Sequence, residues 1–339
     1  MTTTRILIMG AGSVGCYLGG VLAAAGLEVH FVGRPRVLGG LRQQGLTVSD
    51  LDGRQTALPA AALHLHGTVP AALQPAVTLL SVKSGATAEA ARELAAALPP
   101  GSLVVSMQNG IGNAERGRVA APGLDWRPGM VPFNIAELAP GRFHRGTGGA
   151  LAAQGNGDEP ALRALQQAFE SLGLKLKLHA DLAAVQWGKL VINLNNPVNA
   201  LSGRPLRAEL LERGYRRCWA ALQAEALDLL EAGGIAVAQM TALPPRKLLR
   251  VLRLPSPLFR LIAAKMLKID DKARSSMADD LALGRVTEID ALSGEVVRLA
   301  QRLGRRAPLN EKMLGLVQAW PQRPQPYGPR ELERALGIR

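Results

Sequence analysis

The 339-residue sequence contains only two cysteines, Cys16 and Cys218, and aromatic residues make up only 4% of it. Two cysteines are too few for a disulfide framework, so we expect a cytoplasmic protein in which Cys16 is a small buried residue. The few aromatic side chains leave little to stack on nucleic-acid bases. Zinc-finger spacing and RNA-recognition motifs are missing too, so we expect no nucleic-acid partner.

Long apolar runs are also missing. No run of 18 apolar residues occurs, and the first apolar segment leads into a glycine-rich turn instead of a small-residue cleavage site. We therefore expect neither a membrane span nor a signal peptide. His144 has no Cys or His at metal-ligand spacing, so we expect no metal site and interpret His144 as a half-buried strand residue.

Acidic residues are outnumbered by basic ones. Forty Lys and Arg stand against 27 Asp and Glu, which gives a net charge of +13. Such a charge suits nucleic acid or a membrane surface, but it suits equally an Arg-rich and Ala-rich sequence with basic residues spread over its helices. We prefer the second interpretation. With 47% apolar residues, the chain is long enough for two domains with substantial cores.

Residues 5–34 read as a strand, a glycine-rich turn, a helix and a second strand. The turn has GxGxxG spacing, in which the first Gly permits a tight turn, the second lets a pyrophosphate approach the backbone and the third lets the helix pack closely on the strand. A flexible loop can have the same spacing, but a strand before it and a helix after it favour a dinucleotide site. The residues of this expected site are Gly10, Ala11, Gly12, Ser13, Val14 and Gly15.

The second strand, at 28–32, is not followed by the Asp or Glu that binds the ribose 2′-hydroxyl of NAD. Arg34 stands there instead, with Arg36 two positions further on. Because a guanidinium matches a 2′-phosphate, the sequence favours NADP (NADPH) over NAD as cofactor. The alternative is an exposed basic loop without a ligand.

Strands expected at 77–82 and 103–107 are separated by an Ala-rich helix at 86–98. This alternation predicts a doubly wound parallel sheet, in which ligands lie outside the carboxyl ends of the strands. Lys83 and Asn109 follow two such ends and are candidates for the same site. A solvated lysine and an ordinary Asn-Gly turn are the alternatives.

Irregular strand pieces are expected in two places. One is a hairpin at 48–54, and the other consists of short antiparallel pieces between 130 and 154 that would cap the sheet edge. A helix at 161–172 and a last strand at 174–178 then close the first domain.

From residue 181 onward the pattern is almost entirely helical. At helical spacing Lys189, Asn193 and Asn196 share one stripe with apolar residues. Burial in such a stripe would lower the pKa of the lysine, unless its ammonium snorkels to water.

A helix break is expected near Gly284, since residues 287–290 fit a capping box and would start a new helix. The break would let Ser276 and Glu288 face one side. In the alternative interpretation Glu288 only complements the dipole of the new helix.

These features together resemble the ketopantoate reductase (2-dehydropantoate 2-reductase) family, from the first strand to about Val317. The resemblance implies an N-terminal Rossmann-type doubly wound parallel sheet followed by an all-helical C-terminal domain. The separate points of likeness are GAGSVG with Arg34, Val82-Lys83, Gln108-Asn109-Gly110-Ile111-Gly112, Trp187-Gly188-Lys189-Leu190, Asn193, Asn196-Pro197, Ser275-Ser276-Met277 and Thr287-Glu288-Ile289-Asp290.

The same resemblance implies roles for single residues. It makes Lys189 the general acid and Glu288 a catalytic carboxylate, and it places Lys83 and Asn109 on the cofactor side. The implied substrate contacts are Asn193, Asn196 and Ser276. The sequence departs from the family in two ways: Asn193 and Asn196 are one residue closer than in some members, and Ala273 stands where some members have a substrate-binding Asn.

We therefore expect an NADPH-dependent reductase that converts ketopantoate to pantoate, for pantothenate and coenzyme A synthesis. Its expected parts are an NADP-binding domain at 1–180, a helical substrate domain at 181–320 and a peripheral tail at 321–339. The expected partner is a small 2-oxo acid, with a possible homodimer. A sister reductase for another 2-oxo acid or an opine-type substrate is one alternative, and a non-catalytic NADP sensor or nucleic-acid binder is the other.

The basic and apolar segment 235–272 is longer than in compact members of the family. We interpret it as extra helical packing, with a lid, a dimer surface or a membrane-surface element as alternatives.

Overall fold

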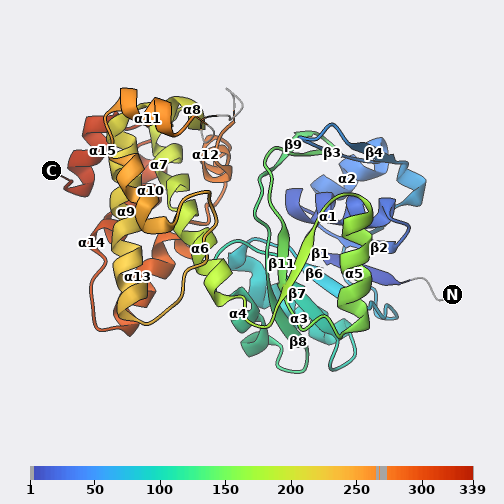
Figure 1. The fold of residues 1–339 in the computed structure, drawn as a ribbon. Coiled ribbons are helices and arrows are strands. Elements are labelled where there is room, and N and C mark those ends of the chain that lie inside the picture. Colours follow the sequence, from blue (N-terminus) through green and yellow to red (C-terminus); the bar gives the residue numbers. More distant parts are fainter. Residues whose placement is uncertain (1–3, 265–266, 268–272, 339) are drawn as a thin grey trace. The chain divides into compact units, whose positions relative to one another are not determined.

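The computed structural model describes residues 4–264, 267 and 273–338. The chain divides into two compact units, Met1–Leu182 and Ala183–Arg339 (Figure 1). In the described part of the chain, no helix is both long and apolar enough to cross a membrane.

The first unit is built on a sheet that, within the described residues, has eight strands. They are β1 (Arg5–Met9), β2 (Glu28–Val32), β5 (His64–His66), β6 (Val77–Leu80), β7 (Leu103–Ser106), β8 (Asp125–Met130), β11 (Leu151–Gln154) and β12 (Leu176–His179). Their order is β12-β11-β8-β7-β6-β1-β2-β5. Strands β8, β7, β6, β1, β2 and β5 run parallel to one another. Strand β11 pairs antiparallel with β8, and β12 pairs parallel with β11 at the edge of the sheet. The expected parallel sheet is thus present, with an antiparallel edge.

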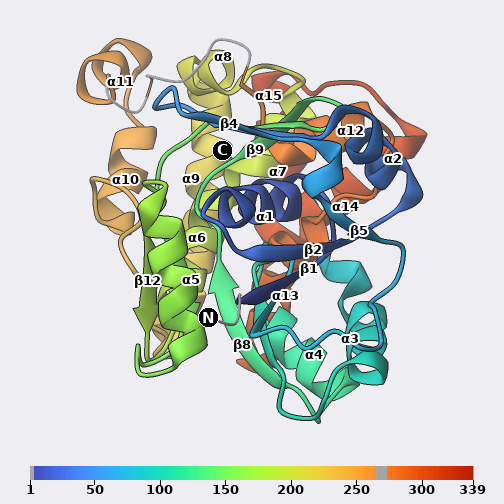
Figure 2. The same cartoon turned by 90° about the vertical axis from the view of Figure 1, so that its right-hand side faces the viewer.

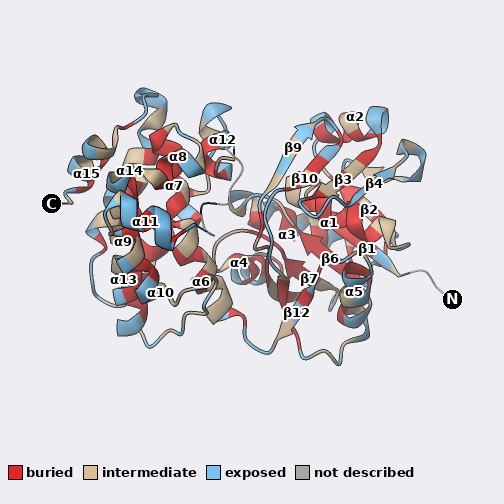
Figure 3. Cartoon of the chain, turned by 45° about the horizontal axis from the view of Figure 1, so that its top comes forward, coloured by how far each residue is buried: buried red, intermediate tan, exposed pale blue. Residues whose placement is uncertain are grey.

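Helices cover both faces of this sheet, which is why its central strands are apolar throughout. Ile6 and Ile8 of β1 face one core, which includes residues of α1 (Ser13–Ala24) and α5 (Pro160–Ser171). Leu7 and Met9 face the other core, with α3 (Thr87–Ala97) and α4 (Asn113–Ala120). Figure 2 shows α1 on one side of β1 and β2, and α3 and α4 on the other; the buried residues are red in Figure 3. The remaining helical pieces of this unit are α2 (Pro35–Gln44), η1 (Ala60–Ala62) and η2 (Ser84–Ala86).

A second sheet lies on the far side of α1 from β1 and β2 (Figure 2). Its strands are β3 (Leu46–Asp50), β4 (Gln55–Leu58), β9 (Ile135–Ala139) and β10 (Arg142–Arg145), in the order β4-β3-β10-β9. The expected hairpin is confirmed, since β3 and β4 pair antiparallel. The expectation that the pieces between 130 and 154 cap the main sheet is wrong for β9 and β10. Strand β10 pairs with β3 instead, and β9 pairs with β10; a buried ion pair of 3.0 Å links Arg145 of β10 to Asp50 of β3.

The second unit is helical. Its α-helices are α6 (Ala183–Asn193), α7 (Asn195–Ser202), α8 (Leu206–Leu211), α9 (Arg213–Ala232), α10 (Pro245–Leu252), α11 (Ser256–Ile262), α12 (Ser276–Ala282), α13 (Ser293–Arg302), α14 (Pro308–Gln318) and α15 (Pro329–Leu336), with 3₁₀ turns η3 (Ile289–Ala291) and η4 (Trp320–Gln322). The long helix α9 is central, because α7, α10, α13, α14 and α15 all pack on it. Its apolar face accordingly includes fully buried residues such as Cys218 and Leu222.

Segment 235–272 contributes α10 and α11. Leu248, Leu249 and Leu252 of α10 are buried, and this helix packs on α9, which agrees with extra helical packing. Residues 265–266 and 268–272 of the segment lie outside the described residues.

The expected helix start at residue 287 needs correction. The chain does break at Gly284, whose φ is +61°. However, only the 3₁₀ turn η3 follows, Glu288 precedes it without a side-chain cap, and the next α-helix begins at Ser293. Ile289, within this turn, and Leu292, directly after it, are both buried.

The C-terminal segment was expected to be peripheral, and the structure differs. Helix α15 packs on α9 and buries Leu332 and Leu336 completely. The Tyr215 hydroxyl of α9 donates a hydrogen bond of 2.7 Å to the carbonyl of Tyr327. This segment is therefore an integral part of the core of the second unit.

Candidate active site

The glycine-rich turn between β1 and α1 has the geometry that its spacing predicts. Gly10 has a φ of +112°, and a Cβ on Gly15 would lie 2.1 Å from the carbonyl oxygen of Gly10, so both positions require glycine. A Cβ on Gly12 would meet nothing within 4 Å, which leaves the space outside the turn open. Helix α1 starts at Ser13 without a side-chain cap and without an acidic residue in its first turn. An anionic group therefore fits at this helix N-terminus.

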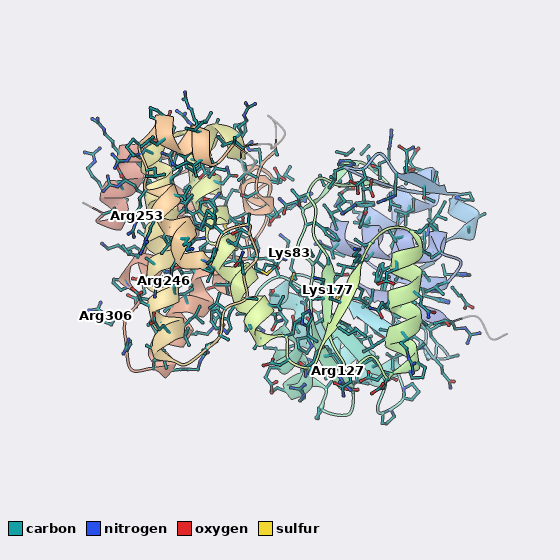
Figure 4. All side chains as sticks on the ribbon, viewed as in Figure 1. Lys83, Arg127, Lys177, Arg246, Arg253 and Arg306 are labelled. Carbon is teal, nitrogen blue, oxygen red and sulfur yellow. The ribbon has the colours of Figure 1, made fainter. Side chains whose placement is uncertain are left out.

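The loops after β6 and β7 are bonded to this turn and to each other. The Ser81 hydroxyl donates to the carbonyl of Gly10 at 2.8 Å, and the Ser84 hydroxyl donates to that of Asn109 at 3.1 Å. Gln108 is buried, and its amide donates to the carbonyl of Val82 at 2.9 Å. These bonds place Lys83 and Asn109 beside the glycine turn. Lys83 is exposed and is labelled in Figure 4.

Sequence analysis named Gln108 only as part of a family motif, without a role, and did not single out the two serines. Their only local signal is that polar residues directly follow the ends of buried strands.

Arg34 begins the connection from β2 to α2 and is exposed. It forms no ion pair with any described residue, whereas Arg36 lies 3.6 Å from Glu137. The residues at this end of β2 thus fit a 2′-phosphate, with Arg34 as the available guanidinium.

Lys189 lies on α6 with Asn193, and both are partly exposed beside the buried Leu190 and Val191. Desolvation by burial lowers the pKa of Lys189 to about 8, and the nearby carboxylate of Glu288 opposes this shift. Burial is the larger of the two effects on this pKa. The preceding residue, Gly188, packs closely on the backbone of Ala238: a Cβ on Gly188 would lie 2.4 Å from the Ala238 carbonyl oxygen.

The expected stripe does not run along a single helix. The helix ends at Asn193, Leu194 forms a turn, and α7 begins at Asn195. Asn196 nevertheless remains partly exposed, like Asn193 and Lys189.

Behind this stripe lies a buried polar network that sequence analysis missed. Asn195 and Asn199 donate to one carboxylate oxygen of Glu209, at 3.1 and 3.3 Å. Asn199 also accepts a 2.9 Å hydrogen bond from the backbone N–H of Ser275, and the Ser275 hydroxyl donates to the carbonyl of Asn196 at 3.1 Å. Burial raises the pKa of Glu209 to about 8.

This network fixes the start of α12 next to Asn196. Ser275 is the buried cap of α12 and accepts from the N–H of Ala278, while Ser276 is exposed. The structure therefore brings Lys189 together with Glu288, and Asn196 together with Ser276, all within the second unit. The glycine turn, Arg34, Lys83 and Asn109 lie within the first unit.

Two further expectations concern His144 and Cys16. His144 is half-buried on β10 and bonded to the Ser49 hydroxyl at 2.9 Å, and Cys16 is a buried free thiol. No group of three or more His, Cys, Asp or Glu suited to a metal ion occurs among the residues that the structure describes.

Comparison with known proteins gives matches over nearly the whole chain. A family model described as ketopantoate reductase PanE/ApbA matches residues 6–156, and the model of the C-terminal part of that family matches residues 181–320. The 2-dehydropantoate 2-reductase of Pyrococcus horikoshii is 27% identical over 323 residues, which are 93% of this chain and 97% of that protein. The enzyme of the same name from Mesorhizobium japonicum is 27% identical over 338 residues, with the same coverage.

Solved structures agree with these matches. A PanE/ApbA family ketopantoate reductase from Ralstonia eutropha JMP134 superimposes with a TM-score of 0.77 at 27% identity, over 93% of this chain and 97% of that one. A D-mandelate dehydrogenase with NADH and anilino(oxo)acetate has the same fold, with a TM-score of 0.75 at 19% identity, over 99% of this chain and 100% of that one. The chain belongs to the ketopantoate reductase family.

Proposed function

We propose that this protein is an NADPH-dependent reductase of a small 2-oxo acid, with ketopantoate as its substrate and pantoate as its product. The observation that carries the proposal is the state of Lys189. This lysine is partly buried beside Glu288, and burial lowers the pKa of Lys189 to about 8. A lysine in this state is a competent proton donor near neutral pH.

The cofactor part of the proposal rests on the first unit. The open space at Gly12 and the uncapped start of α1 suit a pyrophosphate, and the exposed Arg34 suits a 2′-phosphate. Relatives named 2-dehydropantoate 2-reductase and a fold neighbour solved with NADH support a nicotinamide cofactor. We assign residues 1–180 to NADP binding and residues 181–320 to the substrate.

The chemistry requires a hydride donor and a proton donor. NADPH held by the glycine turn and Arg34 would supply the hydride for the carbonyl carbon of the 2-oxo acid. Negative charge then grows on the carbonyl oxygen, where the ammonium group of Lys189 stabilises it and donates a proton from Nζ. The neutral lysine regains its proton from solvent, so that charge and atoms balance over the cycle.

The other polar residues of the second unit orient the substrate in this proposal. The carboxylate of Glu288 accepts a hydrogen bond from the substrate hydroxyl and stabilises the ammonium form of Lys189. The amides of Asn193 and Asn196 and the hydroxyl of Ser276 bind the remaining oxygens of the substrate. The backbone of Asn196 and the start of α12 are already fixed by Ser275, so these groups are preorganised.

Oxidation of NADPH and of NADH should be measured across a panel of 2-oxo acids that includes ketopantoate, 2-oxoisovalerate, pyruvate and phenylglyoxylate. We expect the highest kcat/KM for ketopantoate with NADPH. A preference for phenylglyoxylate would replace ketopantoate by an aromatic 2-oxo acid and favour the sister reductase. Tight NADPH binding without turnover of any 2-oxo acid would favour the sensor.

A further inference from the structure

The second unit carries a groove of about 410 Å³ over α9, away from the residues of the proposed reaction. Its floor includes the small side chains of Ala221 and Ala224 on α9. Arg253, directly after α10, lines it together with Arg305 and Arg306 from the connection between α13 and α14. Figure 4 shows Arg253 and Arg306 on the same side of the second unit, beside α9.

Arg253, Arg305 and Arg306 are exposed, and none forms an ion pair with a described residue. Some other arginines of this unit are paired, for example Arg217 with Glu333 and Arg298 with Glu295, each at 2.8 Å, whereas Arg250 and Arg260 form no ion pair with a described residue.

The two carboxylates that line the groove are already engaged. Glu225 accepts hydrogen bonds from the backbone N–H groups of Leu309 and Asn310, at 2.9 and 2.8 Å, at the start of α14. Asp228 pairs with Arg246 at 2.6 Å. Both carboxylates remain charged, but the three arginines outnumber them, so the lining of the groove keeps a net positive charge of one.

Guanidinium groups that converge on a concave site are suited to phosphate, because each presents two parallel N–H donors to two oxygens. The groove volume of about 410 Å³ lies within the usual range for small-molecule sites, and the alanine floor leaves room for an organic part. We propose that this groove binds a small molecule with two or more phosphate groups, held by Arg253, Arg305 and Arg306. The site shares no residue with the proposed substrate site on α6, α7 and α12.

Binding would bring negative charge between three cations that otherwise repel each other. It should therefore stabilise the folded protein and weaken as salt screens the interaction. A binder with this chemistry would be a phosphorylated metabolite or nucleotide, distinct from the 2-oxo acid.

The test uses the full chain and inorganic pyrophosphate as the probe, with calorimetry for the dissociation constant and thermal melting for stability. The key variant replaces Arg253, Arg305 and Arg306 by Ala. A matched control replaces Arg42, Arg92 and Arg330, which are equally exposed, so that the net charge changes by the same amount. A Gly12→Ala variant, whose methyl group would obstruct a pyrophosphate at the glycine turn, tests whether the probe binds there instead.

We expect the groove variant to bind pyrophosphate at least about tenfold more weakly than the wild type, while the control and Gly12→Ala stay within about twofold. Replacement of the three groove arginines by Lys should retain part of the affinity, because charge remains but the planar fork is lost. Equal losses in the groove variant and the control would overturn the proposal, because the binding would then depend on total charge. Groove-dependent binding of RNA but not of pyrophosphate would overturn it too, in favour of a macromolecular polyanion.

Discussion

Lys189 is the residue at which burial and charge act against each other. Burial lowers its pKa to about 8 although Glu288 opposes the shift. Because the ammonium form is the proton donor, the rate should be highest below this value and fall as pH rises through it. We expect Lys189→Ala to bind NADPH as well as the wild type, but to lose about 10²–10⁴-fold in kcat together with the alkaline limb of the profile.

Lys177→Ala is the matched control, because Lys177 is exposed on β12 and labelled in Figure 4. It should retain the wild-type rate and pH profile. If Lys189→Ala turned ketopantoate over at the wild-type rate with the same alkaline limb, Lys189 would be no more than a snorkelling helix residue.

Arg34 determines the cofactor in our proposal. Arg34→Asp removes a charge-assisted pair with the 2′-phosphate and adds repulsion, so NADPH binding should weaken by roughly 2–4 kcal/mol while NADH binding changes little. Dissociation constants for both cofactors measure the difference. Arg42→Asp, an exposed position on α2, should leave the ratio of the two constants unchanged. An unaltered preference in Arg34→Asp would refute the assignment of NADP to this residue.

In the glycine turn, one glycine is expected to matter for stability and another for cofactor binding. A Cβ at Gly15 would collide with the carbonyl of Gly10, so Gly15→Ala should push α1 away from β1 and lower the free energy of unfolding. Gly12 has open space at its Cβ position, so Gly12→Ala should be as stable as the wild type. Its methyl group would still obstruct the approach of a pyrophosphate, so NADPH binding should weaken. Urea unfolding and NADPH titration test the pair, and equal behaviour of the two variants would contradict it.

We expect the packing of helix α15 to contribute to the stability of the second unit. Leu332 is fully buried there, so Leu332→Ala should lower the free energy of unfolding by about 2–5 kcal/mol. Leu258→Ala is the control: this leucine is 50% exposed, and its replacement should change stability by less than about 0.5 kcal/mol. Denaturant unfolding of both variants distinguishes a docked helix from a peripheral tail, for which the two changes would be equally small.

At the scale of the whole molecule, Glu209 links stability to pH. Its pKa rises from 4.5 to about 8 on folding, because burial disfavours the carboxylate. Between these two values the folded protein keeps a proton that the unfolded chain releases, so this contribution to stability falls as pH rises and levels off above about 8. The slope is at most about 1.4 kcal/mol per pH unit for one proton.

Glu209→Gln removes this proton exchange and keeps the shape of the side chain. We expect the wild type to lose stability relative to the Gln variant as pH rises from 4.5 towards 8, as measured by unfolding at several pH values. Parallel curves for the two proteins would show that Glu209 does not titrate over this interval.

The parts of the fold that sequence analysis predicted correctly depend on local patterns. Apolar runs bounded by Gly and Pro predicted β1, β6 and β7, and the spacing of Gly10, Gly12 and Gly15 predicted the turn. Short or partly polar elements were missed. The strand β5 contains His64 and His66, and β8 contains Pro128 and Gly129, so neither has the composition of a typical strand.

The sequence by itself determined the dinucleotide-type turn, the alternation of strands and helices and the helical second unit, because each depends on residues close together in the chain. Only the tertiary structure decided which segments meet. The Arg145–Asp50 pair in the second sheet joins residues 95 positions apart, the Tyr215–Tyr327 bond that holds the C-terminal segment spans 112, and Ser275 reaches Asn199 across 76. The pKa values of Lys189 and Glu209 follow from the same long-range packing, since burial depends on every segment that surrounds a group.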